Sequence, residues 1–249
     1  MKNEEFYIHD ETVHNKSAAR IILPLLFSTA IPHSVLDVGC GLGTWLSVCE
    51  ELGIADYFGV DGDYVDKQKL TIPIQKFAAV ELRKEFDRAR KFDLVICLEV
   101  AEHLPESSSD ILVRNLIRHG DRLLFSAAIP GQGGQYHLNE QWPEYWERRF
   151  NQHGYYFHDT IRPLIWANEE IEWWYRQNIF VVSKEAPTRI PYNSLSVVHP
   201  KFQELTRRNR EQYYQSLIHG KQGLRLAFRI LLSSIRYAMG RLAFKLLRK

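Results

Sequence analysis

The sequence has 249 residues, a hydrophobic content of 45% and a formal net charge of +2. This composition is ordinary for a globular protein and allows one sizeable α/β domain with an appendage. Every stretch of about 18 residues carries a charge and the first residues are acidic, which argues against a membrane span and a signal peptide. Three cysteines without C-x-x-C spacing argue against a disulfide framework or a zinc knot, so we expect a cytoplasmic protein.

The charge is unevenly distributed along the chain. Residues 201–249 contain twelve Lys and Arg against two Glu, a net charge of +10, whereas the preceding 200 residues have a net charge of −8. Opposed charges of this kind indicate that the C-terminal segment contacts something anionic and that the body of the protein does not.

The first clear feature is a buried strand, residues 34–38, that ends in the glycine-rich turn G-C-G-L-G. Gly39, Gly41 and Gly43 let the backbone turn sharply and bring its N–H groups close to a ligand. The G-x-G-x-G spacing differs from the G-x-G-x-x-G of a dinucleotide site. Asp37 would repel a pyrophosphate but suits a ligand with an ammonium or sulfonium group.

The second strand, residues 57–61, ends in Asp61, where a carboxylate can accept both hydroxyls of a ribose. The remaining pattern alternates strands and helices and ends in a β-hairpin. We expect strands at residues 73–79, 92–98, 122–127, 155–161 and 178–183, and helices within residues 12–30, 44–52, 106–119, 139–154 and 166–176. Three prolines mark residues 186–200 as a linker between a domain at residues 1–185 and a basic helical extension at residues 201–249.

The motif D-V-G-C-G-x-G followed by G-V-D resembles the class I S-adenosylmethionine-dependent methyltransferases. The resemblance implies an α/β fold with a seven-stranded, mostly parallel Rossmann-like sheet and helices on both faces. It also implies S-adenosylmethionine as the cofactor, covered by a lid from residues 12–30. The residues that would bind it are Asp37, Gly39, Gly41 and Gly43 at the methionine end, Asp61 on the ribose, Glu81 near the adenine in place of the usual Asp, and Glu99 beside the cofactor.

A second cluster follows the strand at residues 92–98, in the sequence E-V-A-E-H. Glu99, Glu102 and His103 can share one face of a helical turn, and His137 follows the neighbouring strand at the same sheet edge. Two carboxylates and two imidazoles suit Mg²⁺ or Mn²⁺, which would polarise an acceptor hydroxyl and lower its pKa. The cluster is similar to the metal sites of small-RNA 2′-O-methyltransferases and ubiquinone-pathway O-methyltransferases.

This cluster has two other interpretations. His103 or His137 could act as a general base without a metal, or the residues could only pack near the cofactor. The predicted catalytic residues are therefore His103, His137 and Glu102. A hydroxyl acceptor needs a base or a metal and an amine does not, so we predict O-methylation over N-methylation.

The loop at residues 129–134 and the segment H-L-N-E-Q-W after it lie where this fold usually builds its acceptor pocket. Glycines in the loop are typical of a mobile flap or of an ordinary surface turn. The Trp and Tyr residues between 142 and 175 could form a stacking platform for an acceptor, although their spacing also fits core packing. The segment resembles methyltransferase-domain proteins of bacterial surface-polysaccharide gene sets, which favours a sugar hydroxyl, as on a lipid-linked glycan.

Three alternatives to the glycan acceptor remain. A lipophilic phenol or quinone precursor would also explain the metal cluster and the extension. An RNA 2′-hydroxyl would require the basic extension to bind nucleic acid. In a non-catalytic interpretation, the domain binds the cofactor and serves as a membrane-associated partner protein.

The extension carries an apolar stripe bordered by cations. If helical, residues 221–249 are long enough to lie flat on an anionic membrane surface and too charged to cross it, which predicts a peripheral protein on the inner membrane face. The alternative is a helix docked on its own domain or on a second subunit. Nucleic acid is a less favoured partner because the cations alternate with large aliphatic side chains. The stripe consists of Leu224, Phe228, Leu231, Ile235, Met239, Leu242 and Leu246.

Overall fold

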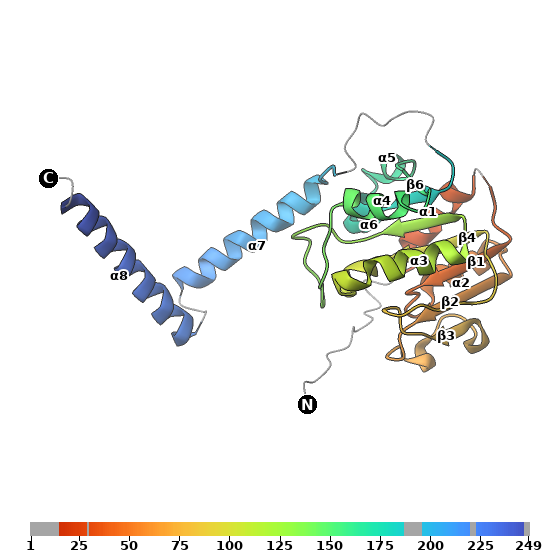
Figure 1. Ribbon diagram of the computed structural model, residues 1–249, viewed down its shortest axis with the longest axis horizontal. Helices are drawn as coiled ribbons and strands as arrows, with labels where there is room; N and C mark the ends of the chain where they lie inside the picture. Colours follow the sequence, from red (N-terminus) through yellow and green to blue (C-terminus); the bar gives the residue numbers. More distant parts are fainter. Residues whose placement is uncertain (1–14, 29, 187–195, 220–222, 247–249) are drawn as a thin grey trace. The chain divides into compact units, whose positions relative to one another are not determined.

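The computed structural model describes residues 15–28, 30–186, 196–219 and 223–246. The chain forms two compact units, Met1–His199 and Pro200–Lys249. The first unit contains the whole sheet and the second consists of two helices (Figure 1).

A seven-stranded sheet organises the first unit, in the order β3-β2-β1-β4-β5-β7-β6. Strands β1 to β5 pair in parallel, and β7 lies antiparallel between β5 and β6. This confirms the predicted mostly parallel methyltransferase sheet. The strands are β1 (Ser34–Val38), β2 (Asp56–Asp61), β3 (Phe77–Ala79), β4 (Leu94–Leu98), β5 (Arg122–Ser126), β6 (Tyr156–His158) and β7 (Phe180–Ser183).

Helices cover both faces of the sheet (Figure 1). One apolar core joins the sheet to α1 (Ser17–Phe27), α2 (Thr44–Glu51), α5 (Arg162–Ile165) and α6 (Trp173–Asn178). The other core joins the opposite face to α3 (Ser109–His119) and α4 (Pro143–Asn151). Because strands β1 and β4 are buried on both sides, their sequences are nearly continuous apolar runs. Short 3₁₀ turns lie at Lys67–Lys69, Ile74–Lys76, Ala101–His103 and Glu106–Ser108.

Two predicted helices differ from their expected form. Helix α4 begins at Pro143 and not at residue 139, because Asn139 N–H donates to Glu102 O and Gln141 N–H donates to Ala128 O. A proline at the first helical position loses no helical hydrogen bond, so it marks the start. Helix α1 packs in the core through Ile22, Leu23 and Leu26, whereas Asn15, just before it in the predicted lid, lines the cavity described below. Residues 12–14 of the predicted lid lie outside the described residues.

The predicted linker at residues 186–200 includes a segment that packs on the first unit. Gln177 Nε2–H donates to Val197 O over 2.5 Å, and the His199 ring lies 4.6 Å from the Trp166 ring. Residues 196–199 therefore belong to the first unit, while residues 187–195 lie outside the described residues.

The second unit contains α7 (Pro200–Ile218) and α8 (Leu224–Leu246). Side chains of α8 are described as far as residue 237, and neither α7 nor this part of α8 contains a buried side chain. Among the described residues, no helix combines the length and the apolar character that a bilayer span requires.

Candidate active site

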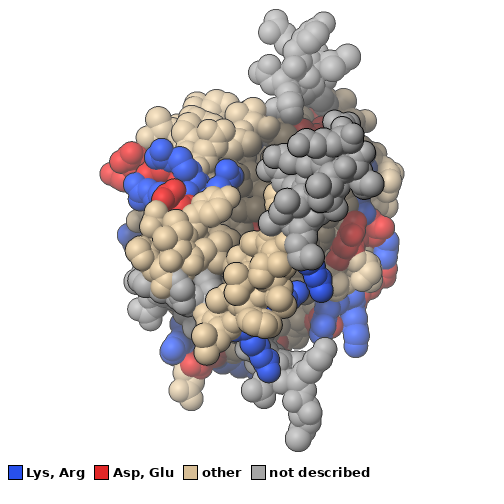
Figure 2. Space-filling model, turned by 90° about the vertical axis from the view of Figure 1, so that its left-hand side faces the viewer, with Lys and Arg blue, Asp and Glu red and all other residues tan. Residues whose placement is uncertain are grey.

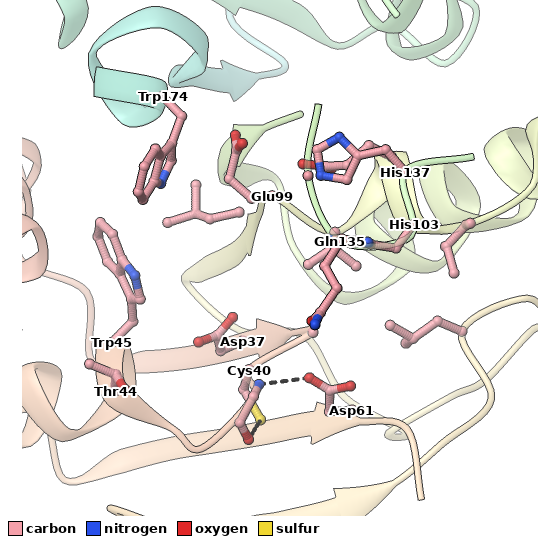
Figure 3. A pocket seen from close by; sticks show the side chains of 18 of the residues that line it. Asp37, Cys40, Thr44, Trp45, Asp61, Glu99, His103, Gln135, His137 and Trp174 are labelled. Carbon is pink, nitrogen blue, oxygen red and sulfur yellow. Dashed lines mark hydrogen bonds between the residues drawn. The ribbon is translucent and has the colours of Figure 1, made fainter. Parts of the chain in front are cut away.

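A cavity of about 450 Å³ opens at the carboxyl edge of the parallel strands (Figure 3). The turns after β1, β2 and β4 form its floor, and the loop after β5 and helix α6 form its walls. Ligands of open α/β sheets bind at this edge, and a volume of this size accommodates a small molecule.

The glycine turn after β1 brings the backbone close to this cavity. Gly39 has a φ of +82°, and a Cβ there would lie 2.3 Å from Cγ2 of Val100. Gly43 precedes helix α2 with a φ of +84°, and a Cβ there would lie 2.7 Å from Ile72. These positions therefore require glycine for both conformation and space. Gly39 and Gly41 line the cavity, whereas Gly43 shapes the turn behind it.

Asp61 lies at the end of β2 and is fixed by three donors. Its carboxylate accepts the N–H groups of Gly41 and Gly62, each over 2.6 Å, and the hydroxyl of Tyr64 over 2.7 Å. A carboxylate offers about four acceptor sites, so one remains for a ligand hydroxyl. The structure thus places Asp61 in the cavity and links it to the glycine turn (Figure 3).

Asp37 lines the same cavity with only 3% of its surface exposed. Burial, and secondly the charge of Asp61, raise the pKa of Asp37 well above its usual range. A bound cation would stabilise the ionised form of this carboxyl, which suits the ammonium and sulfonium groups of S-adenosylmethionine.

Glu81 does not line the cavity. Its carboxylate accepts a hydrogen bond from Nη2 of Arg83 over 2.6 Å, and this contact lowers the pKa of Glu81 to about 2. Leu82 lines the cavity in its place. The structure therefore separates Glu81 from the site that the sequence assigns to it, because the side chain turns outward to its local ion pair.

Trp45 from α2 and Trp174 from α6 border the cavity (Figure 3), and Tyr175 from α6 also lines it. The rings of Trp45 and Tyr175 meet edge to face with centroids 5.4 Å apart. Trp146, in contrast, is buried in the core. Of the predicted aromatic residues, Trp174 and Tyr175 thus line the cavity, Trp146 lies in the core and Trp142 is exposed.

Glu99 follows β4 with a φ of +53°, which is uncommon for a residue with a Cβ. Its carboxylate accepts hydrogen bonds from Gln132 Nε2 over 2.9 Å and from Asn178 Nδ2 over 3.2 Å. Asn178 Nδ2 also lies 2.9 Å from Gln132 Oε1. Glu99 lines the cavity (Figure 3). These bonds direct its carboxylate toward the two carboxamides, and it is not in the group of described residues that could share a metal ion.

That group consists of Glu102, His103 and His137, whose ligand atoms lie within 4.8 Å of one another. The two imidazole rings meet edge to face with centroids 4.9 Å apart. They converge because β4 and β5 are parallel neighbours whose carboxyl ends share one edge. Glu102 O accepts N–H groups from Leu138 and Asn139, which attaches the His137 segment to the turn after β4.

The Glu102 carboxyl is fully buried, and neither of its oxygens forms a hydrogen bond of normal geometry with the described residues. Burial and the charge of Glu99 raise the pKa of Glu102 well above its usual range, and the nearby backbone of Glu102 and Ala128 offsets this only in part. A buried carboxylate without a partner is costly, and a cation would compensate it.

Glu140 connects His137 to the glycine-rich loop after β5. Its Oε1 lies 2.8 Å from His137 Nδ1 and accepts Gly133 N–H over 2.7 Å, and its Oε2 accepts Gly131 N–H over 2.7 Å. A Cβ on Gly134 would lie 2.2 Å from His137 Nε2, so loop and ring are in close contact. The loop at residues 129–134 is therefore hydrogen-bonded to Glu140 and forms part of the cavity wall.

Sequence reasoning did not predict Trp45 or Asn178 at this site, and it placed Gln132 and Glu140 in the acceptor-pocket segments without assigning them a role. An aromatic residue directly after the glycine turn was the only available signal for Trp45. Glu140 lies three residues after His137, a spacing that allows a carboxylate–imidazole contact. The contacts that Gln132 and Asn178 make with Glu99 are tertiary contacts that no local pattern indicates.

Comparison with known proteins agrees with this geometry. The sequence profile of the methyltransferase domain family matches residues 9–173. A ubiquinone biosynthesis O-methyltransferase from Glaesserella parasuis serovar 5 (strain SH0165) is 29% identical over 150 residues, which cover 55% of this chain. The match covers 63% of that relative.

Solved structures share the fold at low sequence identity. The magnesium protoporphyrin IX methyltransferase from Synechocystis PCC 6803 with bound SAH has a TM-score of 0.52 and 17% identity, over 73% of this chain and 90% of that chain. A sugar N-methyltransferase from Streptoalloteichus sp ATCC 53650 has a TM-score of 0.52 and 14% identity, over 75% and 99%. The chain therefore belongs to the methyltransferase domain family and has the fold of a class I S-adenosylmethionine-dependent methyltransferase.

Proposed function

We propose that this methyltransferase transfers a methyl group to a hydroxyl, and that the acceptor is a sugar of a lipid-linked surface glycan. The observation that carries the O-methyl assignment is the group Glu102, His103 and His137 at the cavity wall. A hydroxyl needs a base or a metal to lose its proton, whereas an amine does not.

The three residues fit a divalent cation. One buried carboxylate and two imidazoles can hold a divalent cation with open positions, and the two imidazoles favour Mn²⁺ over Mg²⁺, which prefers oxygen ligands. The Glu102 oxygens have no other partner of normal geometry among the described residues. Such an ion, when bound, would polarise the acceptor hydroxyl and lower its pKa.

The remaining side chains have distinct roles in this proposal. Asp37 and Asp61 would hold the cofactor so that its methyl group faces the acceptor, since in-line displacement depends on alignment. His137 has Nδ1 engaged with Glu140, which leaves Nε2 for the ion or for the acceptor proton. Glu140 would stabilise the imidazolium if Nε2 took that proton.

Support for a sugar comes from the segment that continues beyond His137. It leads to a second hollow of about 340 Å³, where Trp142 is 39% exposed. An aromatic face beside amide, carboxylate and guanidinium groups can stack on a sugar ring and bind its hydroxyls. The hollow is lined by Gln141, Trp142, Glu144, Tyr145, Arg148 and Ser196.

A lipophilic phenol is the second candidate acceptor. The side chains on either side of His137 favour it, because Leu138 is 67% exposed and Tyr136 is 39% exposed. A relative at 29% identity is a ubiquinone biosynthesis O-methyltransferase, which also supports a phenol. Both candidates share O-methyl transfer and differ only in the acceptor.

The test combines product analysis with metal removal. Full-length protein is incubated with labelled S-adenosylmethionine and either a cell-envelope fraction or a set of simple catechols and phenols, and the labelled product is identified. We expect a labelled glycan, activity that chelation reduces by about a hundredfold or more, and recovery with Mg²⁺ or Mn²⁺. His103→Ala/His137→Ala should lose this activity, whereas His153→Ala, in the exposed turn after α4, should retain it.

Two results would contradict parts of the proposal separately. A labelled phenol without a labelled glycan would reject the sugar and retain O-methylation. Full activity after exhaustive chelation, with no metal found by elemental analysis, would reject the ion and leave His103 or His137 as the base.

A further inference from the structure

Helix α8 presents an apolar face that no described part of its own unit buries. Leu224 is 91% exposed, Phe228 62%, Leu231 55% and Ile235 46%. Their spacing of four, three and four residues places them on one side of the helix. A contiguous exposed apolar surface of this kind marks an interaction site, whereas single exposed apolar residues do not.

The positive charge of α8 indicates that its partner is anionic. The helix contains five cations and no acidic residue. Arg225, Arg229 and Arg236 lie roughly 100–140° around the helix from the apolar face, at 100° per residue, so they flank it on one side. Long basic side chains can bury their stems beside apolar surface while their charged ends reach an anionic layer. Figure 2 shows one face of the molecule, on which basic side chains (blue) and acidic ones (red) lie among uncharged ones (tan).

Other partners would match either the apolar face or the positive charge of α8, but not both. A second copy of α8 would cover the apolar face but bring ten cations together without an acid, which Coulomb repulsion opposes. A nucleic acid would neutralise the cations but leave Leu231 and Ile235 exposed. An anionic bilayer provides acidic headgroups for the arginines and acyl chains for the apolar face.

We propose that α8 binds in the headgroup region of an anionic lipid bilayer, with the apolar face of Leu224, Phe228, Leu231 and Ile235 inserted and its arginines at the phosphate level. The helix binds at the surface and does not cross, because no described helix meets the requirements of a membrane span. This proposal does not depend on the metal or on the acceptor.

The test uses the full chain and vesicle flotation. We expect the protein to float with vesicles that contain phosphatidylglycerol and to remain unbound with pure phosphatidylcholine. One cation near an anionic surface contributes about a fivefold change in affinity, so Arg225→Gln/Arg229→Gln/Arg236→Gln should weaken binding about a hundredfold. Leu231→Ser/Ile235→Ser should abolish flotation although every cation remains, because insertion is lost.

A matched control changes the same number of arginines on α7. Arg207→Gln/Arg208→Gln/Arg210→Gln removes an equal charge from a helix without a comparable apolar stripe, and should change binding less than about threefold. Binding of S-adenosylmethionine should be unchanged in every variant, which verifies that the catalytic domain is folded.

Three outcomes would overturn the proposal. The first is full chain that stays unbound with phosphatidylglycerol vesicles. The second is equal weakening by the α7 and α8 arginine variants with no effect of Leu231→Ser/Ile235→Ser, which would indicate unspecific charge attraction. The third is a dimer in sedimentation that Leu231→Ser/Ile235→Ser dissociates and that vesicles do not disrupt, which would assign the face to a second copy.

Discussion

The imidazole of His137 lies 2.8 Å from the carboxylate of Glu140, through Nδ1 and Oε1. The same carboxylate accepts the N–H groups of Gly131 and Gly133, so one side chain sets both the ring orientation and the shape of the loop. A carboxylate on one ring nitrogen fixes the tautomer and leaves the other nitrogen as a ligand or base. Glu140 is therefore a positioning residue for the proposed ion site.

The substitution Glu140→Gln tests this role. An amide replaces one acceptor oxygen by a donor, so at least one of the three donors on Glu140 loses its partner. We expect kcat to fall and the Mg²⁺ or Mn²⁺ concentration for half-maximal activity to rise, each about 10–100-fold. The dissociation constant of S-adenosylmethionine should change by less than about threefold, since Asp37 and Asp61 are untouched.

The matched control is Glu147→Gln, which lies on helix α4 seven residues later and outside the cavity lining. It should leave kcat, metal dependence and cofactor affinity unchanged. Equal metal dependence in the wild type and Glu140→Gln would show that Glu140 does not position His137 for an ion.

The substitution Gly39→Ala tests the close contact between the glycine turn and the loop after β4. A Cβ there would lie 2.3 Å from Cγ2 of Val100, and the φ of +82° strains any other residue. Overpacking costs about 1–3 kcal/mol and the left-handed backbone about 1–2 kcal/mol, so Gly39→Ala should lower the free energy of unfolding by about 2–5 kcal/mol. Denaturant unfolding measures this loss, and cofactor affinity should fall with it because Gly39 lines the site.

Two further variants separate the cost of the left-handed backbone from the cost of the contact with Val100. Gly154 also has a left-handed backbone, with a φ of +74°, but no atom lies within 4 Å of the position of a Cβ. Gly154→Ala should therefore lower the free energy of unfolding by only about 1–2 kcal/mol. Val100→Ala should recover about 1–3 kcal/mol of the Gly39→Ala loss in a double-mutant cycle. An additive cycle would mean that Val100 does not limit this position.

The sheet was predictable from the sequence because its central strands are buried on both faces. Leu94–Leu98 is continuously apolar, and this pattern depends only on local sequence. The edge strand β3 is reduced to Phe77–Ala79, one of whose residues is buried, so its sequence carried a weak signal. The start of α4 was wrong by four residues because Asn139 N–H bonds to Glu102 O, a contact between residues far apart in the sequence.

Sheet topology predicted which acidic residues lie at the carboxyl edge of the sheet, but it did not predict the directions in which their side chains point. Acids at the ends of β1, β2 and β4 had to lie at one edge, and Asp37, Asp61 and Glu102 do line the cavity. The direction of Glu99 depends on Asn178, 79 residues later, and the direction of Glu81 depends on its ion pair with Arg83. Neither contact follows from strand order, so neither side chain could be oriented from the sequence.

Asp37 links cofactor binding to pH. In the unliganded protein, burial and the charge of Asp61 raise the pKa of Asp37, so the carboxyl is protonated at pH values where an exposed aspartate is ionised. Because the ionised form of Asp37 is disfavoured in the cavity, the unliganded fold loses stability as the pH rises from the ordinary pKa of an aspartate to the raised pKa of Asp37. A cationic ligand favours that ionised form, so binding releases a proton and affinity rises with pH.

We therefore expect the dissociation constant of S-adenosylmethionine to fall by up to about tenfold per pH unit below the raised pKa of Asp37, and to level off above it. Calorimetry in two buffers of different ionisation enthalpy should detect proton release in the lower range. Asp37→Asn should bind more weakly at high pH and lose both the slope and the proton release. Asp63→Asn, with its side chain 91% exposed in the loop after β2, should keep both. A wild-type affinity that is constant with pH, without proton release, would show that Asp37 is ionised before the cofactor binds and that the cation does not determine its charge.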